Sequence, residues 1–224
     1  MREAASSRAA SAVLIPALLS FLLLSALAAE AYPGGTYCEP DASSYRFWGN
    51  FLCDLTADIT RRGEDNSRAA AFARAAFGVF GVGLVPFFWL LGGLTARGRA
   101  AVRALGVIAG VATLLLAWVP SRAGLFLHAG FVFAATVPGL IAATLGAVAV
   151  VRRARKDAAM RVIALFAVLA LSTAGADAAG YVYALATSAD CLAWLPLLQK
   201  FAALWVIAWM FSVALYALYR PRAS

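Results

Sequence analysis

Long apolar runs alternate with short polar segments along this chain, and residues 30–68 form the one long interruption. Each run approaches the length of about 20 residues that a helix needs to cross the hydrocarbon core of a bilayer. The pattern therefore predicts an all-α bundle of six transmembrane helices, at approximately residues 9–29, 69–94, 101–119, 125–151, 162–185 and 196–219. Because these spans use most of the chain, we expect one integral membrane domain over residues 1–224.

Composition agrees with this class of protein. The chain is 63% hydrophobic and 13% charged, whereas soluble domains are roughly 45–50% apolar and about 25% charged. The net charge of +8 does not indicate a nucleic-acid partner, because the basic residues gather in short segments beside the apolar runs. The partners that we expect are membrane lipids, and the oligomeric state stays open.

The distribution of Lys and Arg predicts how the helices are oriented. Most of the 19 basic residues lie at the amino terminus, near residues 97–103, near residues 152–161 and in the carboxyl-terminal tail. These segments fall on one side of the predicted bundle, and positive charge in short loops marks the cytoplasmic side. We therefore expect both termini in the cytoplasm and residues 30–68 outside it.

The first apolar run has two interpretations. The small residues of ALAAEA, at 26–31, are compatible with a cleavage site, so residues 1–29 could be a secretory signal. A signal usually carries an apolar region of about 7–15 residues, and the run at 9–29 is longer. We expect a retained helix, with cleavage as the alternative.

The three cysteines, Cys38, Cys53 and Cys191, all fall on the predicted outer side. In an oxidising compartment one disulfide is plausible. Cys38 with Cys53 would close a bridge inside the long loop, whereas Cys191 with either would tie that loop to the connection before the sixth helix. Three unpaired thiols are the remaining alternative. No metal-ligand spacing is present, and we expect neither a metal nor a cofactor.

Ionisable side chains are concentrated at one depth near the outer end of the predicted bundle. With a rise of about 1.5 Å per residue, Asp177 lies roughly 24 Å from Arg161, in the outer third of the membrane. Thr173 and Tyr181 share its helix face, because each is four residues away. The other members of this layer are Glu30, Arg74, His128, Gln199 and Lys200.

This layer predicts a polar pocket for a lipid or small amphiphile beneath the long loop. A carboxylate at membrane depth usually turns inward towards a partner, so Asp177 carries most of this hypothesis. Arg74 and Lys200 could instead extend to the interface, and a lone His is more often an interior hydrogen-bonding group. The predicted binding residues are Asn50, Asp54, Arg74, His128, Asp177 and Lys200.

Two other functions are compatible with the same residues, so the sequence leaves open whether the protein is an enzyme. A membrane hydrolase or acyltransferase acting on lipid could use His128 with Asp54 or Asp177 as acid–base groups. The chain contains no GxSxG, HExxH or Gly-rich phosphate loop. A small transporter is the third hypothesis, but no inverted repeat or broken helix pair indicates one.

Several short motifs resemble a known group of membrane proteins. They are YPGGTY at 32–37, FWGNFLCDL at 47–55, Asn66 before a helix that ends in PFFWLL, and VPSRAGLFLHAGFVFA at 119–134. Together they are similar to bacterial six-helix membrane proteins of the type grouped as domain of unknown function 998. That group is distantly similar to the eukaryotic Frag/DRAM/Sfk membrane proteins, whose SDLG-like loop motif corresponds to CDLT here.

In this motif Asp54 and Leu55 fit the pattern, whereas Cys53 and Thr56 depart from it. The resemblance implies a six-helix protein of the bacterial cytoplasmic membrane whose function is unknown. It implies no catalytic residues and no cofactor. Eukaryotic relatives associated with lipid-anchor remodelling or lysosomal membranes favour the lipid hypothesis by analogy alone.

Overall fold

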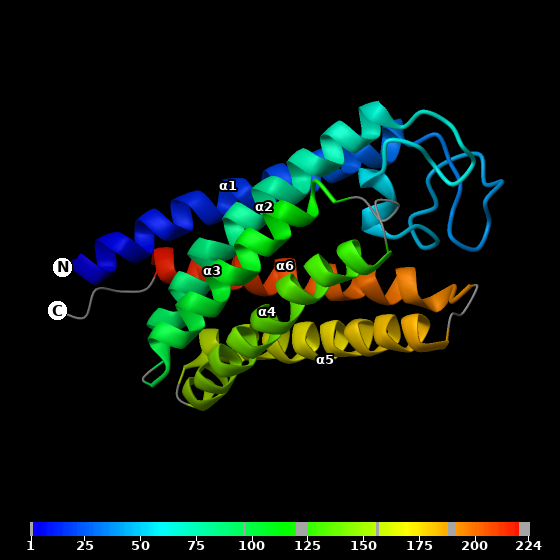
Figure 1. Cartoon of the computed structure of the whole chain (residues 1–224). Helices are drawn as coiled ribbons and strands as arrows, with labels where there is room; N and C mark the ends of the chain where they lie inside the picture. Colours follow the sequence, from blue (N-terminus) through cyan, green and yellow to red (C-terminus); the bar gives the residue numbers. More distant parts are fainter. Residues whose placement is uncertain (1, 96, 120–124, 156, 188–190, 220–224) are drawn as a thin grey trace.

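The computed structural model describes residues 2–95, 97–119, 125–155, 157–187 and 191–219, and these residues form an all-α bundle (Figure 1). Its helices are α1 (Arg2–Ala31), α2 (Ser67–Gly93), α3 (Arg99–Leu116), α4 (Leu125–Ala154), α5 (Ala158–Thr187) and α6 (Trp194–Tyr219). All six are long and apolar enough to cross a membrane. The prediction of a six-helix, multi-pass membrane bundle is therefore confirmed.

Several helices differ in length from the apolar runs that predicted them. Helix α1 already begins at Arg2, and α4 continues to Ala154, whereas α3 ends at Leu116. Hydropathy locates only the apolar part of a helix, because backbone hydrogen bonding continues through polar residues at either end.

Apolar side chains cover the outside of the bundle as well as its core. Leu23 is 62% exposed and Leu165 is 57% exposed, although both lie within spans. Trp209 and Met210 of α6 are instead buried against the interior. A helical surface that is apolar on both sides is what a lipid environment requires.

Helix α2 occupies the interior position of the bundle. It contacts α1, α3, α4 and α6, and α1 also contacts α6. Helices α2 and α3 approach most closely where Gly81 faces Gly110. A Cβ atom on Gly81 would lie 2.7 Å from the Gly110 carbonyl oxygen, so only glycine allows this backbone contact.

The long connection between α1 and α2 covers one end of the bundle; we call its residues 32–66 the roof (Figure 1). Its first turn depends on Gly34 and Gly35, whose φ angles are 138° and 84°. Gly35 donates its N–H to the Ala42 carbonyl oxygen at 2.7 Å, and a Cβ on Gly34 would overlap that oxygen. Within the roof, η1 (Leu52–Thr56) is a short 3-10 helix.

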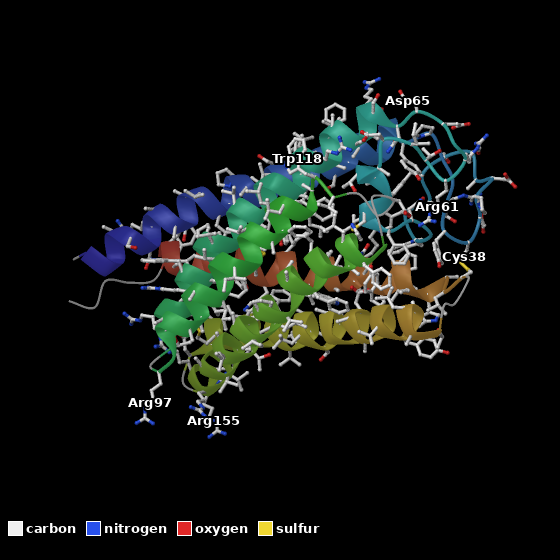
Figure 2. The ribbon with its side chains drawn as sticks, in the orientation of Figure 1. Cys38, Arg61, Asp65, Arg97, Trp118 and Arg155 are labelled. Carbon is white, nitrogen blue, oxygen red and sulfur yellow. A yellow bond between two sulfur atoms is a disulfide. The ribbon has the colours of Figure 1, made fainter. Side chains whose placement is uncertain are left out.

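Basic residues lie at both ends of the molecule. Cys38, Arg61 and Asp65 lie at the roof end, whereas Arg97 and Arg155 lie at the opposite end (Figure 2). Helix α1 begins and α6 ends at that opposite end (Figure 1). The orientation of the bundle in a membrane stays a prediction from the distribution of positive charge.

Candidate functional site

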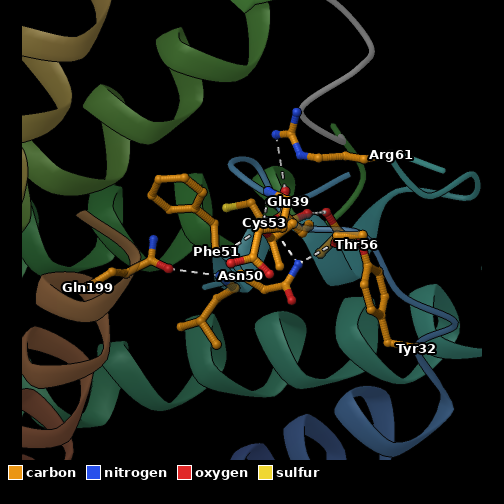
Figure 3. A network of polar contacts seen from close by, with 12 residues as sticks. Tyr32, Glu39, Asn50, Phe51, Cys53, Thr56, Arg61 and Gln199 are labelled. Carbon is orange, nitrogen blue, oxygen red and sulfur yellow. Dashed lines mark hydrogen bonds and ion pairs between the residues drawn. The ribbon is translucent and has the colours of Figure 1, made fainter. Parts of the chain in front are cut away.

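Three contacts join the roof to the beginning of α6. A disulfide links Cys38 to Cys191, with their Cα atoms 5.2 Å apart, while Cys53 stays free. The Lys200 ammonium donates to the Asn50 carbonyl oxygen at 2.6 Å. The Gln199 side-chain oxygen accepts from the Leu52 N–H at 2.8 Å (Figure 3). Of the pairings that the sequence allows, the structure therefore contains the one that ties the roof to the α5–α6 connection.

A cavity of about 480 Å³ lies between the roof and helices α4, α5 and α6. One part of its wall is polar and the remainder is apolar or aromatic. The main lining residues are Tyr37, Phe51, Cys53, Asp54 and Arg61 of the roof, His128, Val132, Phe133 and Thr136 of α4, Asp177, Ala178, Tyr181 and Leu185 of α5, and Leu195 and Gln199 of α6.

Asp54 is a buried carboxylate whose hydrogen-bonding capacity is used by the roof. Its Oδ2 accepts from the Phe51 N–H at 2.9 Å and from Asn50 Nδ2 at 3.3 Å, and its Oδ1 pairs with Arg61 at 3.3 Å. The Phe51 contact caps the beginning of η1. Asp54 therefore holds the roof in shape while one edge of it faces the cavity.

His128 is buried near the beginning of α4 and lines the same cavity. Its Nδ1 lies 2.7 Å from the Val119 carbonyl oxygen. A carbonyl oxygen can only accept a hydrogen bond, so Nδ1 carries a proton, and in the neutral imidazole Nε2 is then the acceptor. This arrangement fixes the ring and leaves a basic nitrogen that could orient a ligand or accept a proton.

Asp177 lines the cavity from α5, one helical turn from Tyr181. Among the described residues its carboxylate has no hydrogen bond or ion-pair partner. Lys200 acts on it only through space, because the ammonium is hydrogen-bonded to Asn50. The carboxylate therefore retains its full capacity to accept hydrogen bonds from a molecule in the cavity.

Arg74, Lys200 and Asn50 are directed towards the roof, and the described part of the cavity wall does not include them. Arg74 pairs with Asp58 at 2.8 Å and donates to the Thr56 carbonyl oxygen at 3.0 Å. The Asn50 amide donates to the Gly35 carbonyl oxygen at 2.8 Å. Their contacts in this structure are with the protein itself, and the exposed Glu30 lies outside the cavity lining as well.

The cavity also contains residues that sequence reasoning did not select. The Arg61 guanidinium lies 4.6 Å from the centroid of the Tyr37 ring, besides pairing with Asp54. Phe133 of α4 was not selected either; its ring packs edge to face against that of Tyr181, which the sequence had placed on the helix face of Asp177, with centroids 6.2 Å apart. No linear spacing connects these residues, because they come from three separate elements.

Cys53 is a free, half-buried thiol that lines the cavity. Burial raises the pKa of Cys53 to about 12, and the Asp54 carboxylate adds to this effect. A neutral thiol is a poor nucleophile, since the thiolate is the reactive form. Within the described parts of the chain, no group of three or more His, Cys, Asp or Glu side chains is placed to hold a metal ion.

Comparison with known proteins adds no assignment: no family model, no curated protein and no solved structure matches this chain. The similarity to the domain of unknown function 998 group therefore stays a prediction from the short motifs. What the site can do follows from its own geometry, which combines a largely apolar cavity with a carboxylate and an imidazole on its wall.

Proposed function

We propose that this membrane protein binds a lipid or small amphiphile in the cavity beneath the roof. The supporting observation is the mixed character of the cavity wall: Asp177 and His128 line it together with Val132, Leu185 and Leu195. Ligand pockets typically have volumes of about 300–1,000 Å³ and apolar walls with a few polar groups. A molecule with a polar end and an apolar body matches both parts of this wall.

The roof contributes to the proposed binding by closing the cavity from outside. The Cys38–Cys191 bridge and the Lys200–Asn50 hydrogen bond hold it against α6. The cavity also borders α4 and α5 within their membrane-spanning parts. An amphiphile would therefore place its apolar part among the helices and its polar part beneath the roof.

A pair of adjacent alanines provides the test. Ala178 lines the cavity, whereas the neighbouring Ala179 is exposed on the outside of α5. We expect Ala178→Trp to fill the cavity and to reduce the bound amphiphile that native mass spectrometry detects after mild extraction. Ala179→Trp is the matched control and should retain it. Equal retention by wild type and both variants would contradict the proposal.

A second candidate function is hydrolysis or acyl transfer on a lipid. The observation that favours it is the Nδ1 contact of His128, which leaves Nε2 as a possible general base. Asp177 is then the better acid–base partner, because Asp54 already pairs with Arg61. In this case His128→Gln should abolish turnover of an ester lipid while thermal unfolding shows that the protein still folds. Turnover that survives the substitution would exclude His128 as the base.

A further inference from the structure

The polar groups of the cavity wall differ in whether the protein already satisfies them. Asp54 pairs with Arg61, and the Gln199 side-chain oxygen accepts from the roof backbone. His128 is bonded through Nδ1 to Val119. Among the lining residues that the structure describes, Asp177 is the charged group without a hydrogen-bonded or ion-paired partner. Its carboxylate can therefore accept hydrogen bonds from a cation or donor group of a molecule in the cavity.

Charge in the cavity favours a positive ligand over a negative one. Arg61, the cation on the described wall, is engaged with Asp54 and stacked over Tyr37. Lys200 lies outside the described wall; one of its three N–H groups donates to the Asn50 carbonyl oxygen, and its charge acts on Asp177 through space. Neither cation forms a hydrogen bond or ion pair with Asp177 among the described residues, so an anionic head group would meet an unpaired carboxylate. A carboxylate in a poorly solvated site is instead stabilised by an opposite charge.

Aromatic rings surround the same space. Tyr37 packs edge to face against Phe51 in the roof, with centroids 6.1 Å apart, and Phe133 packs in the same way against Tyr181. All four rings line the cavity. Aromatic faces attract ammonium groups, and rings combined with a carboxylate form a common recognition site for them. Two independent features of the wall, charge and aromatic content, thus indicate the same chemistry.

We propose that the polar end of the bound amphiphile is an ammonium group, held by the Asp177 carboxylate and the aromatic wall. This inference rests on the proposed binding function and specifies its ligand class. The ammonium can come from a zwitterionic phospholipid head group or from a free alkylammonium compound. Both present the same positive group to Asp177 and an apolar chain to Val132, Leu185 and Leu195.

The experiment compares probes of matched chain length on the full-length protein. One pair is phosphatidylethanolamine and phosphatidylglycerol; the other is dodecyltrimethylammonium and dodecyl sulfate, both below their micellar concentrations. Native mass spectrometry measures the bound fraction. We expect wild type to prefer the ammonium member of at least one pair by about tenfold. Preference within the lipid pair alone identifies a head group as the source, and preference within the detergent pair alone identifies a free amine.

Asp177→Asn keeps the shape of the side chain and removes its charge, so it should abolish the preference. Tyr181→Leu keeps the carboxylate and should weaken the preference several-fold through loss of a ring. Thermal unfolding of each variant identifies any loss of fold, and the two substitutions alter different groups. The ammonium assignment would be overturned if wild type bound the anionic and ammonium members of both pairs equally. It would also be overturned if Asp177→Asn kept the preference of wild type.

The experiment distinguishes a failure of the proposed amphiphile binding from a failure of the ammonium assignment. If Ala178→Trp binds every probe as wild type does, the cavity is not the binding site and both proposals fall. If Ala178→Trp excludes the probes while wild type binds anionic and cationic members equally, the amphiphile site stands and the ammonium assignment is wrong. The Ala179→Trp control separates either outcome from a general effect of adding Trp to α5.

Discussion

The Lys200 ammonium donates a 2.6 Å hydrogen bond to the backbone carbonyl oxygen of Asn50, which is 150 residues away in the chain. Lys200 is only 6% exposed, although it belongs to a membrane-spanning helix. Its ring contact with Phe47, at 5.7 Å to the centroid, also lies in the roof. A basic residue that would otherwise extend to solvent is here part of the attachment of the roof to α6.

We expect Lys200→Met to loosen the roof. The substitution leaves the Asn50 carbonyl oxygen without its charged donor, which costs about 1–3 kcal/mol when the group stays buried. Hydrogen–deuterium exchange should become faster at residues 50–52. Leu204→Met, at a 52% exposed position of the same helix, is the control and should leave exchange unchanged. Unchanged exchange in Lys200→Met would show that the other two contacts suffice.

Substitution of Asp54 and substitution of Asp177 should differ in their effects on the free energy of unfolding. Asp54→Ala removes the acceptor of the Phe51 N–H and of Arg61, so we expect a loss of about 1–3 kcal/mol in the free energy of unfolding. Asp177→Ala removes no bond within the described protein and should have little effect in the absence of ligand. Thermal unfolding in detergent measures both. A larger loss for Asp177→Ala would mean that its carboxylate has a structural role.

Cys53 should show a distinct dependence on pH. Burial raises the pKa of its thiol from 9.0 to about 12, so iodoacetamide should alkylate the folded protein at pH 8 at least about a hundredfold more slowly than the unfolded chain. The folded state keeps this proton to higher pH than the unfolded state does. The corresponding stability is therefore fully present below about pH 9 and is lost as the pH rises towards 12.

Cys53→Ser provides the control for both measurements, because the other two cysteines form the disulfide. In that variant no slow alkylation should be observed. The loss of unfolding free energy between about pH 9 and pH 12 should also be smaller, because the thiol no longer contributes to it. Rapid labelling of folded wild type at pH 8 would show that Cys53 is solvated and that the roof does not close over it.

The contact between α2 and α3 should tolerate no side chain. In Gly81→Ala the new Cβ would lie 2.7 Å from the Gly110 carbonyl oxygen and 2.9 Å from the Leu114 nitrogen. Neither backbone atom can move freely, so we expect a loss of about 1–3 kcal/mol. Gly78→Ala, on the same helix, is the control. Its Cβ would meet only the Leu114 Cδ1 atom at 3.6 Å, an ordinary contact.

Alanine also favours a helix over glycine by about 1 kcal/mol. Gly78→Ala should therefore be neutral or slightly stabilising in the same unfolding assay. If Gly81→Ala and Gly78→Ala unfolded at the same temperature, the close approach of α2 and α3 would not be a determinant of stability.

The sequence predicted the spans because hydropathy is a local property of about 20 consecutive residues. Depth in the membrane stays a prediction from residue counts; the structure places His128 and Asp177 on the wall of one cavity. Depth is a single coordinate, however, and it contains no information on rotation about the bundle. Arg74 shares the depth of these residues but lies on α2, where it pairs with Asp58.

The roof was the part that sequence reasoning described least. Its shape depends on contacts between distant residues, such as Leu52 with Gln199 and Asn50 with Gly35. Three cysteines on one side allow several pairings, and only the fold decides that Cys38 approaches Cys191. Arg61 was not predicted for the same reason: it lies at the site through a tertiary contact with Tyr37, which the linear sequence does not show.

The disulfide between Cys38 and Cys191 closes a large part of the chain into a covalent loop. Helices α2, α3, α4 and α5 lie between the two linked residues in the sequence, whereas α1 precedes and α6 follows this covalent loop. A single proteolytic nick anywhere on this covalent loop leaves one covalently connected molecule until a reductant opens the sulfur link. One cut in any of these four helices therefore leaves both resulting fragments covalently joined, whereas a cut in α1 or α6 does not.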